Sequence, residues 1–255
     1  MPGVSAAAAT AVLPAPFRWR DGHVRIDLPG GHGLFSSRHG GVSAGPFASL
    51  NLGRLTDDPG SNVDENRARL AAQVGLPRTR FLYGRQVHGA EVRRATEPPS
   101  AKRPHAEEDG QATALADAAA LVFTADCLPV LLFAPGAVAA LHGGWRGLAA
   151  GILEEGLRTL AEVGARGPVT AALGPGAGGC CYEVGEEVHA AFADPDARVG
   201  ERNLDLKRIA RQRLERAGVE AVHDVGLCTM CSDDFFSHRR DHGVTGRQAG
   251  VVWRA

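Results

Sequence analysis

Two consecutive apolar runs near the middle of the chain constrain its fold more than any other feature. The stretch "TADCLPVLLFAPGAVAALHGGWRG" (124–147) holds one run that begins after Cys127 and a second that ends at His142. Apolar runs without polar alternation are typical of strands that are buried on both faces. The strongly helical stretch "LAAGILEEGLRTLAEVG" follows, and then another buried strand, "VTAALG". This pattern predicts buried strands covered by helices.

The rest of the chain extends this pattern. An amphipathic helix is expected over 61–76, with Ser61 or Asn62 as its cap, and residues 81–95 read as a strand, a tight turn and a second strand. Helices therefore alternate with strands, but hairpin-like pairs also occur. We predict an α/β fold of the layered α+β kind, a single domain with a mixed β-sheet core and flanking helices.

Composition places the domain boundaries. The opening "MPGVSAAAATAVLPAPF" is small and apolar, is interrupted by Pro14 and Pro16, and lacks the basic start of a secretory signal. We therefore expect residues 1–22 to be a disordered N-terminal tail. Residues 23–255 would form the domain. Residues 94–110, "RATEPPSAKRPHAEEDG", are proline-rich and charged, which predicts a flexible insert within it.

Charge and cysteine content narrow the class of partner. The chain of 255 residues has 28 basic and 29 acidic residues and a formal net charge of −1. This balance gives no long-range attraction to nucleic acid or to a membrane surface, so a small-molecule partner is expected. An odd count of five cysteines favours reduced thiols and a cytoplasmic location. No run approaches the roughly 20 apolar residues of a membrane-spanning helix.

Three residues at strand ends are candidates for one site. Cys127 and His142 lie where apolar runs give way to turns, and His88 lies at the turn in "GRQVHGAEV". One cysteine and two histidines make a three-ligand zinc set, which leaves a fourth position for water or substrate. Bound zinc would lower the pKa of that water to roughly 7.

The same residues allow two other interpretations. Cys127 could be a thiolate nucleophile with His142 or His88 as its base and with Asp126 or another carboxylate orienting the imidazole, which needs no metal. All three could also be core residues with hydrogen bonds to loop backbone. The spacings of 39 and 15 residues do not choose between these possibilities.

Arginines and the other cysteines give weaker signals. Arg38 and Arg146 lie in glycine- or serine-containing loops, and a guanidinium group binds phosphate with two parallel hydrogen bonds. "CTMC" (228–231) is a C-x-x-C motif, but a zinc ribbon needs a second such pair, and the adjacent Cys180 and Cys181 have the wrong spacing. We therefore expect structural thiols there.

Six motifs in order resemble one family. They are "SSRHGGVSAGPFASLNLG", "GRQVHGAEV", "TADCLPVLL", "ALHGGWRGLAAGI", "LGPGAGGCCYEVGEEV" and "FFSHRRDHGVTGRQAGVVW". The chain resembles, from about residue 31 to 253, the laccase-domain or multicopper polyphenol oxidoreductase-like family, whose members are described as purine nucleoside phosphorylases. The resemblance implies Zn²⁺ as cofactor, held by His88, Cys127 and His142, with Cys127 and His142 in the catalytic site. Copper oxidase activity is not expected, because the matched motifs have no H-x-H pair.

The resemblance also implies an activity. Such enzymes phosphorolyse adenosine, inosine, guanosine and S-methyl-5′-thioadenosine to free base and ribose 1-phosphate, and they deaminate adenosine. Their partners are purine nucleosides and phosphate. Arg38 or Arg146 would hold phosphate, and Asn51 would contact ribose or base. Three alternatives stay open: an editing hydrolase that releases L-serine from peptidoglycan precursors, a metal-free Cys–His hydrolase, and a non-catalytic nucleotide- or metal-binding protein.

Overall fold

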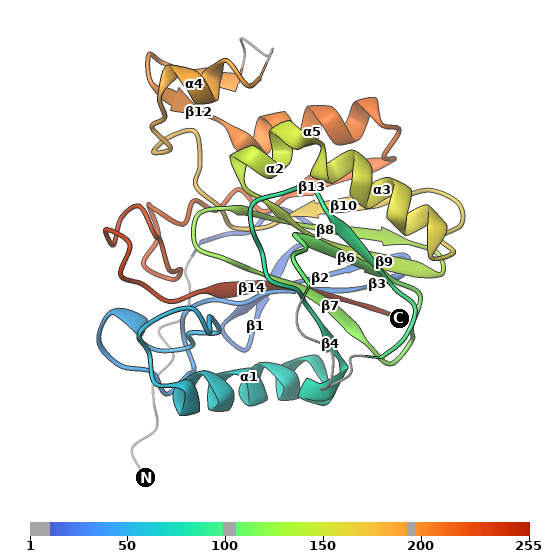
Figure 1. The fold of residues 1–255 in the computed structure, drawn as a ribbon, viewed down its shortest axis with the longest axis horizontal. Coiled ribbons are helices and arrows are strands. Elements are labelled where there is room, and N and C mark those ends of the chain that lie inside the picture. Colours follow the sequence, from blue (N-terminus) through green and yellow to red (C-terminus); the bar gives the residue numbers. More distant parts are fainter. Residues whose placement is uncertain (1–10, 99–105, 193–196) are drawn as a thin grey trace.

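Two six-stranded sheets form the centre of the computed structural model, which describes residues 11–98, 106–192 and 197–255 (Figure 1). The first sheet has the order β1 (Arg18–Arg20), β2 (His23–Leu28), β3 (Gly31–Phe35), β14 (Gln248–Arg254), β7 (Ala119–Thr124) and β4 (Phe81–Leu82). The second has the order β13 (Ala221–Asp224), β10 (Thr170–Leu173), β8 (Leu128–Ala134), β9 (Ala137–Gly143), β6 (Gly110–Thr113) and β5 (Val92–Ala95). Most neighbours are antiparallel, but three pairs are parallel, so both sheets are mixed.

The side chains of β8 show why the apolar runs lack polar alternation. Leu131 and Phe133 pack between the two sheets, whereas Val130 and Leu132 pack on the opposite side, in the apolar cluster that includes Ile152. All of these side chains are fully buried. A strand with two buried faces must be apolar at every position.

Helices cover the outer face of each sheet (Figure 1). Helix α1 (Gly60–Val74) packs Leu70 and Val74 against the first sheet. Helices α2 (Trp145–Ala150), α3 (Ile152–Glu162) and α5 (Leu206–Arg216) cover the second sheet. The resulting order of layers is helix, sheet, sheet, helix, which confirms the layered α/β prediction but divides the expected core between two sheets.

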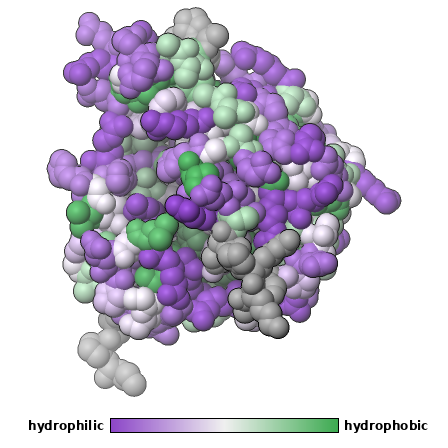
Figure 2. Space-filling model, viewed as in Figure 1, coloured by the Kyte–Doolittle hydropathy of each residue, from purple (hydrophilic) through white to green (hydrophobic). Residues whose placement is uncertain are grey.

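Smaller elements complete the described chain. They are the 3₁₀ helices Gly45–Phe47 and Arg78–Arg80, helix α4 (Glu186–His189), and the strand pair β11 (Arg198–Val199) and β12 (Asn203–Leu204). Figure 2 shows that hydrophilic residues cover most of the face seen in Figure 1, with small apolar patches between them. Among the described residues, no helix has both the length and the apolar character needed to cross a membrane.

Two predicted boundaries differ from the structure. Strand β1 lies within the stretch 1–22 that was expected to be a tail, and it pairs with β2 while Phe17 is buried beside it; residues 1–10 lie outside the described residues. Residues 99–105 of the expected insert also lie outside them, but its two ends are ordered in β5 and in the buried pair Glu108 and Asp109. Helix α1 begins one residue earlier than expected, so Ser61 and Asn62 lie inside its first turn and Pro59 takes the cap position.

Candidate metal centre and active site

His88, Cys127 and His142 come together at one end of the second sheet. Cys127 directly precedes β8, and His142 is near the end of β9, where it pairs with Pro129 in the antiparallel register. His88 lies in the loop between β4 and β5. One ligand atom from each of the three side chains lies within 4.8 Å of the other two, and the imidazole rings have centroids 4.9 Å apart. The three residues therefore share one site.

Asp109 holds two of these three residues in place. Its Oδ1 accepts hydrogen bonds from His142 Nδ1 at 2.7 Å and from the His88 backbone N–H at 2.9 Å. Its Oδ2 accepts from the backbone N–H groups of Val87 and Gly89 at 3.0 and 2.8 Å. Because His142 Nδ1 donates to this carboxylate, its Nε2 is left free to bind a metal.

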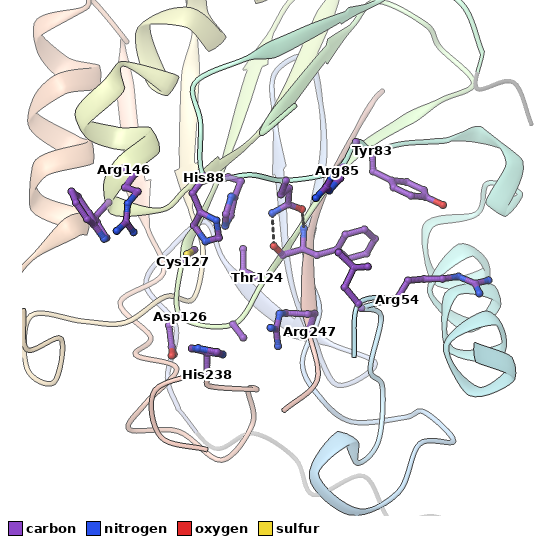
Figure 3. A pocket seen from close by; sticks show the side chains of 18 of the residues that line it. Arg54, Tyr83, Arg85, His88, Thr124, Asp126, Cys127, Arg146, His238 and Arg247 are labelled. Carbon is purple, nitrogen blue, oxygen red and sulfur yellow. Dashed lines mark hydrogen bonds between the residues drawn. The ribbon is translucent and has the colours of Figure 1, made fainter. Parts of the chain in front are cut away.

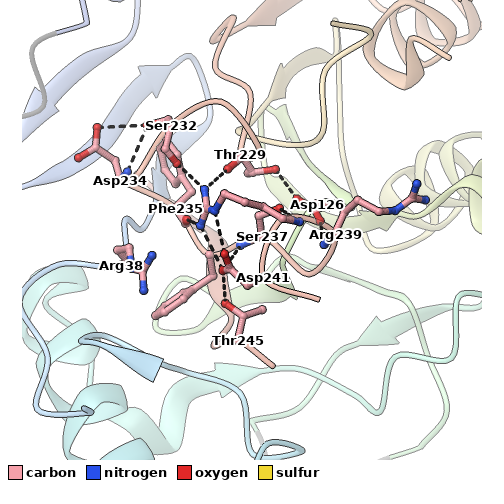
Figure 4. Close-up of polar contacts among 12 residues, drawn as sticks. Arg38, Asp126, Thr229, Ser232, Asp234, Phe235, Ser237, Arg239, Asp241 and Thr245 are labelled. Atoms are coloured by element: carbon pink, nitrogen blue, oxygen red, sulfur yellow. Dashed lines mark hydrogen bonds and ion pairs between the residues drawn. The ribbon is translucent and has the colours of Figure 1, made fainter. Parts of the chain in front are cut away.

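The backbone is strained at the two points where the site is built. His88 has a φ of 63° and Asp126 a φ of 87°, both in the left-handed region. Non-glycine residues persist there only when their surroundings fix them. Asp109 fixes His88, and Asp126 is fixed by Thr229 Oγ1 and the Arg239 backbone N–H, each donating to its carboxylate at 2.7 Å (Figure 4). Asp126 in turn sets the direction of Cys127.

Electrostatics favour a charged pair in the site. Burial opposes a thiolate at Cys127, but the neighbouring His142 outweighs it and lowers the pKa of Cys127 to about 6. Burial likewise opposes an imidazolium at His142, but Cys127 and Asp109 raise its pKa to about 9. Against burial, the hydrogen bond from His142 lowers the pKa of Asp109. A thiolate is the form of cysteine that binds metals and acts as a nucleophile.

Gly144 leaves room for an ion beside these ligands. A Cβ atom built at Gly144 would lie 2.9 Å from His88 Cδ2, 3.3 Å from Cys127 Sγ and 3.8 Å from His142 Cε1. The donor set of one thiolate and two imidazoles, with one His fixed by a carboxylate, is a combination that zinc accepts. The site thus fits a metal ion in its chemistry and in its space.

The three residues form part of the wall of a cavity of about 630 Å³ (Figure 3). Aromatic side chains line it, namely Tyr83, Phe123, Trp145 and Tyr182. Arginines also line it: Arg67 of helix α1 and five outside that helix, namely Arg54, Arg85, Arg146, Arg239 and Arg247. A mostly apolar cavity with a few convergent polar groups is typical of a small-molecule site.

The predicted substrate contacts occupy different places. Arg146 lines the cavity, with its guanidinium carbon 4.2 Å from the centroid of the Trp145 ring, and makes no hydrogen bond or ion pair with the other described residues. Arg38 does not line it and donates Nε to the carbonyl oxygen of Ala48. Asn51 is fully buried outside the cavity wall, where its Oδ1 accepts from the backbone N–H groups of Gly53 and Arg247. Of the three, only Arg146 is placed to meet a ligand in this cavity.

Sequence reasoning missed Asp109 and Tyr182. Asp109 is the last of three consecutive acidic residues at the end of the expected insert, where a carboxylate reads as a solvated charge. The one local signal for Asp109 is that it directly precedes β6, which starts at Gly110. Tyr182 lies in the motif "LGPGAGGCCYEVGEEV", but no role was predicted for it, and it lines the cavity.

Fold and site together define a layered α/β protein with a Cys–His cluster, able to hold a metal ion, in the wall of a small-molecule cavity. The chain belongs to the multi-copper polyphenol oxidoreductase laccase family, whose model matches residues 32–255. Its fold is that of solved members: YlmD from Geobacillus stearothermophilus has a TM-score of 0.83 and 34% sequence identity over 94% of this chain and 99% of that one. The Neisseria meningitidis protein NMB0706 has a TM-score of 0.80 and 36% identity over 92% and 99% of the two chains.

Two relatives whose names state an activity share a higher sequence identity with this chain. A purine nucleoside phosphorylase of Streptomyces coelicolor is 42% identical over 239 residues, which cover 90% of this chain and 98% of that protein. The purine nucleoside phosphorylase YfiH of Escherichia coli is 42% identical over 230 residues, covering 86% and 91%.

Proposed function

We propose that this protein is a zinc-dependent purine nucleoside phosphorylase. Its substrates are adenosine, inosine, guanosine and S-methyl-5′-thioadenosine, and it also deaminates adenosine to inosine. The observation that carries this proposal is the cluster of His88, Cys127 and His142 in the wall of an aromatic- and arginine-lined cavity. The names of the relatives from S. coelicolor and E. coli support the nucleoside as substrate.

The donor set favours zinc over copper. A blue-copper centre also uses two histidines and a cysteine, but it adds a weak axial ligand that is typically methionine. Met230 is the one methionine among the described residues, and it is absent from the cavity wall. When bound, zinc acts as a Lewis acid that polarises a substrate oxygen or activates a water.

Aromatic side chains suit the purine. Phe123 and Tyr83 meet edge to face with ring centroids 5.5 Å apart, and Tyr182 lines the cavity beside the cluster. Flat apolar surfaces of this kind stack on a heterocyclic base. Thr124 adds a buried hydroxyl that has no hydrogen-bond partner among the described residues, so it is free to bind a polar atom of the nucleoside.

Arginines suit the phosphate. Arg146 has no competing acceptor among the described residues, and Arg247 uses Nη1 for the carbonyl oxygens of Thr245 and Gly246. In Figure 3 the two guanidinium groups lie on opposite sides of His88 and Cys127. Arg146 would hold a phosphate with paired hydrogen bonds. In phosphorolysis a phosphate oxygen then bonds to the anomeric carbon, the glycosidic bond breaks, and the base leaves with a proton.

Product analysis tests the proposal. Zinc-loaded protein should release hypoxanthine and ribose 1-phosphate from inosine only when phosphate is present, and should form inosine from adenosine without phosphate. Cys127→Ala should lose both activities together with the zinc, whereas Arg158→Ala, at an exposed arginine of α3, should keep them.

Three outcomes would contradict it. Zinc-loaded protein that releases no base from any of the four nucleosides would refute the activity, and release of L-serine from a peptidoglycan precursor would replace it. Full turnover in a zinc-free preparation would leave Cys127 as a nucleophile of a metal-free enzyme.

A further inference from the structure

The four cysteines outside the candidate active site gather at a second place. Cys180, Cys181, Cys228 and Cys231 have sulfur atoms that all lie within 4.8 Å of one another. Cys231 Sγ is 2.9 Å from Cys181 Sγ and 3.6 Å from Cys180 Sγ. In a tetrahedral zinc site with Zn–S bonds of about 2.3 Å, neighbouring sulfur atoms are about 3.8 Å apart. The 3.6 Å pair is close to this spacing, and Cys181 and Cys231 would separate by about 0.9 Å to reach it, so a small shift lets the four thiols surround one ion.

Local backbone explains how an adjacent pair and a C-x-x-C pair can meet. Cys180 and Cys181 lie in a turn over 179–181, so their side chains need not point to opposite sides as they would in a strand. Cys228 and Cys231 also bracket a turn, in which the Ser232 backbone N–H donates to the Cys228 carbonyl oxygen. The adjacent spacing of Cys180 and Cys181 does not fit a zinc ribbon, but in this turn it still lets both side chains face one point.

A backbone N–H group donates to one of the four sulfur atoms. The Gly178 N–H donates to Cys228 Sγ at 3.2 Å. A Cβ atom at Gly178 would lie 3.2 Å from Cys180 Sγ and 3.3 Å from Cys228 Cβ, so glycine makes the close approach possible. Backbone N–H donors that stabilise ligand sulfurs are a usual part of metal–thiolate sites.

We propose that Cys180, Cys181, Cys228 and Cys231 bind a second zinc ion in a closed, structural site. All four are free thiols, and the 2.9 Å between the closest sulfurs is longer than the 2.03–2.05 Å of a disulfide bond. A disulfide would use only two of the four. Four sulfur donors around one point match zinc, which takes four ligands when its role is structural.

Such an ion would join two loops that shape the active-site cavity. Tyr182 follows Cys181 and lines the cavity. Thr229 follows Cys228, and its hydroxyl donates to Asp126, the residue that precedes Cys127 (Figure 4). The loops otherwise meet through few backbone contacts, such as Thr229 N–H to the Gly176 carbonyl oxygen at 3.1 Å. The second zinc would therefore fix the positions of Tyr182 and Asp126 relative to each other.

Metal analysis of protein purified with a phosphine reductant tests this inference, and it does not depend on enzyme activity. Wild type should carry two zinc ions per chain. Cys231→Ser and Cys180→Ser should each lose one ion and keep that of Cys127, whereas Cys127→Ala should lose the other. Ser232→Ala, next to a proposed ligand, should keep both. If the cysteine variants fail to fold, cobalt substitution of wild type replaces them as the test. A site with four thiolates should then add sulfur-to-cobalt charge-transfer absorption well above that of the single thiolate Cys127, because this absorption rises with the number of thiolate ligands.

Either of two results would overturn the inference. One is a single zinc ion per wild-type chain that Cys231→Ser leaves in place. The other is a mass two hydrogens below that of the reduced chain, with a Cys181–Cys231 disulfide in its peptide map, after purification under reductant. A failed phosphorolysis assay with two ions present would refute the proposed function alone.

Discussion

Asp109 Oδ1 accepts the Nδ1 proton of His142 at 2.7 Å, and the same carboxylate accepts the N–H groups of the turn that carries His88. One buried side chain thus orients two of the three proposed zinc ligands. We expect Asp109→Asn to weaken zinc binding about 10- to 100-fold, because the neutral amide is a poorer acceptor and presents an N–H₂ group to some of these donors.

Competition with a chromophoric chelator measures this effect. The matched control is Glu97→Gln, which removes an exposed carboxylate from the same connection between β5 and β6. Equal zinc affinity in Asp109→Asn and wild type would mean that the carboxylate does not support the metal.

Gly144 gives a steric test of the same centre. The methyl group of Gly144→Ala would lie 2.9 Å from His88 Cδ2 and 3.3 Å from Cys127 Sγ, so at least one ligand must move. We expect a loss of zinc affinity with little change in the melting temperature of the metal-free protein. Gly60→Ala is the control, since its new methyl group would meet nothing closer than Arg54 Nη1 at 3.4 Å. Retention of full zinc affinity by Gly144→Ala would show that the cluster tolerates the contact.

Removing the metal should expose an unusually acidic thiol. Without metal, His142 lowers the pKa of Cys127 to about 6 against the opposing effect of burial. Alkylation of Cys127 by iodoacetamide in chelator-treated protein should therefore rise with pH to a plateau, with a midpoint near pH 6, because only the thiolate reacts. Zinc should protect it. Peptide mass mapping separates Cys127 from the four other cysteines.

The cause of that shift can be tested separately. His142→Asn removes the main positive partner and should move the alkylation midpoint of Cys127 upward, because burial then opposes the thiolate with only His88 left to favour it. An unchanged midpoint would show that His142 does not govern the acidity of Cys127.

The buried His23 should make stability depend on pH. Burial, with a contribution from Arg25, lowers the pKa of His23 to about 4, and its Nδ1 accepts the Ser37 N–H at 3.2 Å. In the unfolded chain the pKa is about 6.5. Between about pH 6.5 and pH 4 the unfolded chain therefore binds the extra proton, and the free energy of unfolding falls as the pH falls, by about 3 kcal/mol in total.

Denaturant unfolding across this pH window checks the prediction. His23→Gln should flatten the pH dependence, because glutamine offers a neutral acceptor without a titrating group. His242→Gln, at an exposed histidine, should leave the slope of wild type unchanged. Parallel slopes for wild type and His23→Gln would assign the pH dependence to other groups.

The sequence predicted those parts of the site that follow from strand pairing. Cys127 and His142 flank two apolar runs joined by the Pro135–Gly136 turn, and an antiparallel pair necessarily brings their outer ends together. His88 is 39 residues from Cys127, and no local rule joins it to β8. Its position at a turn after a strand made it a candidate, and the family resemblance then implied that it is a ligand together with Cys127 and His142. Asp109 could not be predicted, because its burial follows from the position of β6 between β5 and β9.

The errors also have physical reasons. Strand β1 has the sequence Arg-Trp-Arg, too short and too polar for a periodic signal. Tertiary contacts order it, namely its pairing with β2 and the stacking of Trp19 on Phe235. Spacing did not predict that the four other cysteines meet, because two turns, 50 residues apart, set their side-chain directions. Turn conformation of this kind depends on tertiary contacts that spacing rules omit.

Arg146 should separate phosphorolysis from deamination. Its guanidinium group has no hydrogen-bond acceptor among the described residues, so phosphate would gain both of its paired donors. A hydrogen bond to a charged group contributes about 1.5–3 kcal/mol, so Arg146→Ala should raise the KM for phosphate about 10- to 100-fold. Arg146→Lys should restore part of this loss, because it keeps the charge but not the paired geometry. Deamination of adenosine uses no phosphate and should change little. Initial rates of phosphorolysis at varied phosphate, compared with rates of adenosine deamination, measure this difference, with Arg158→Ala as control. An equal loss of both activities would place Arg146 at the nucleoside instead.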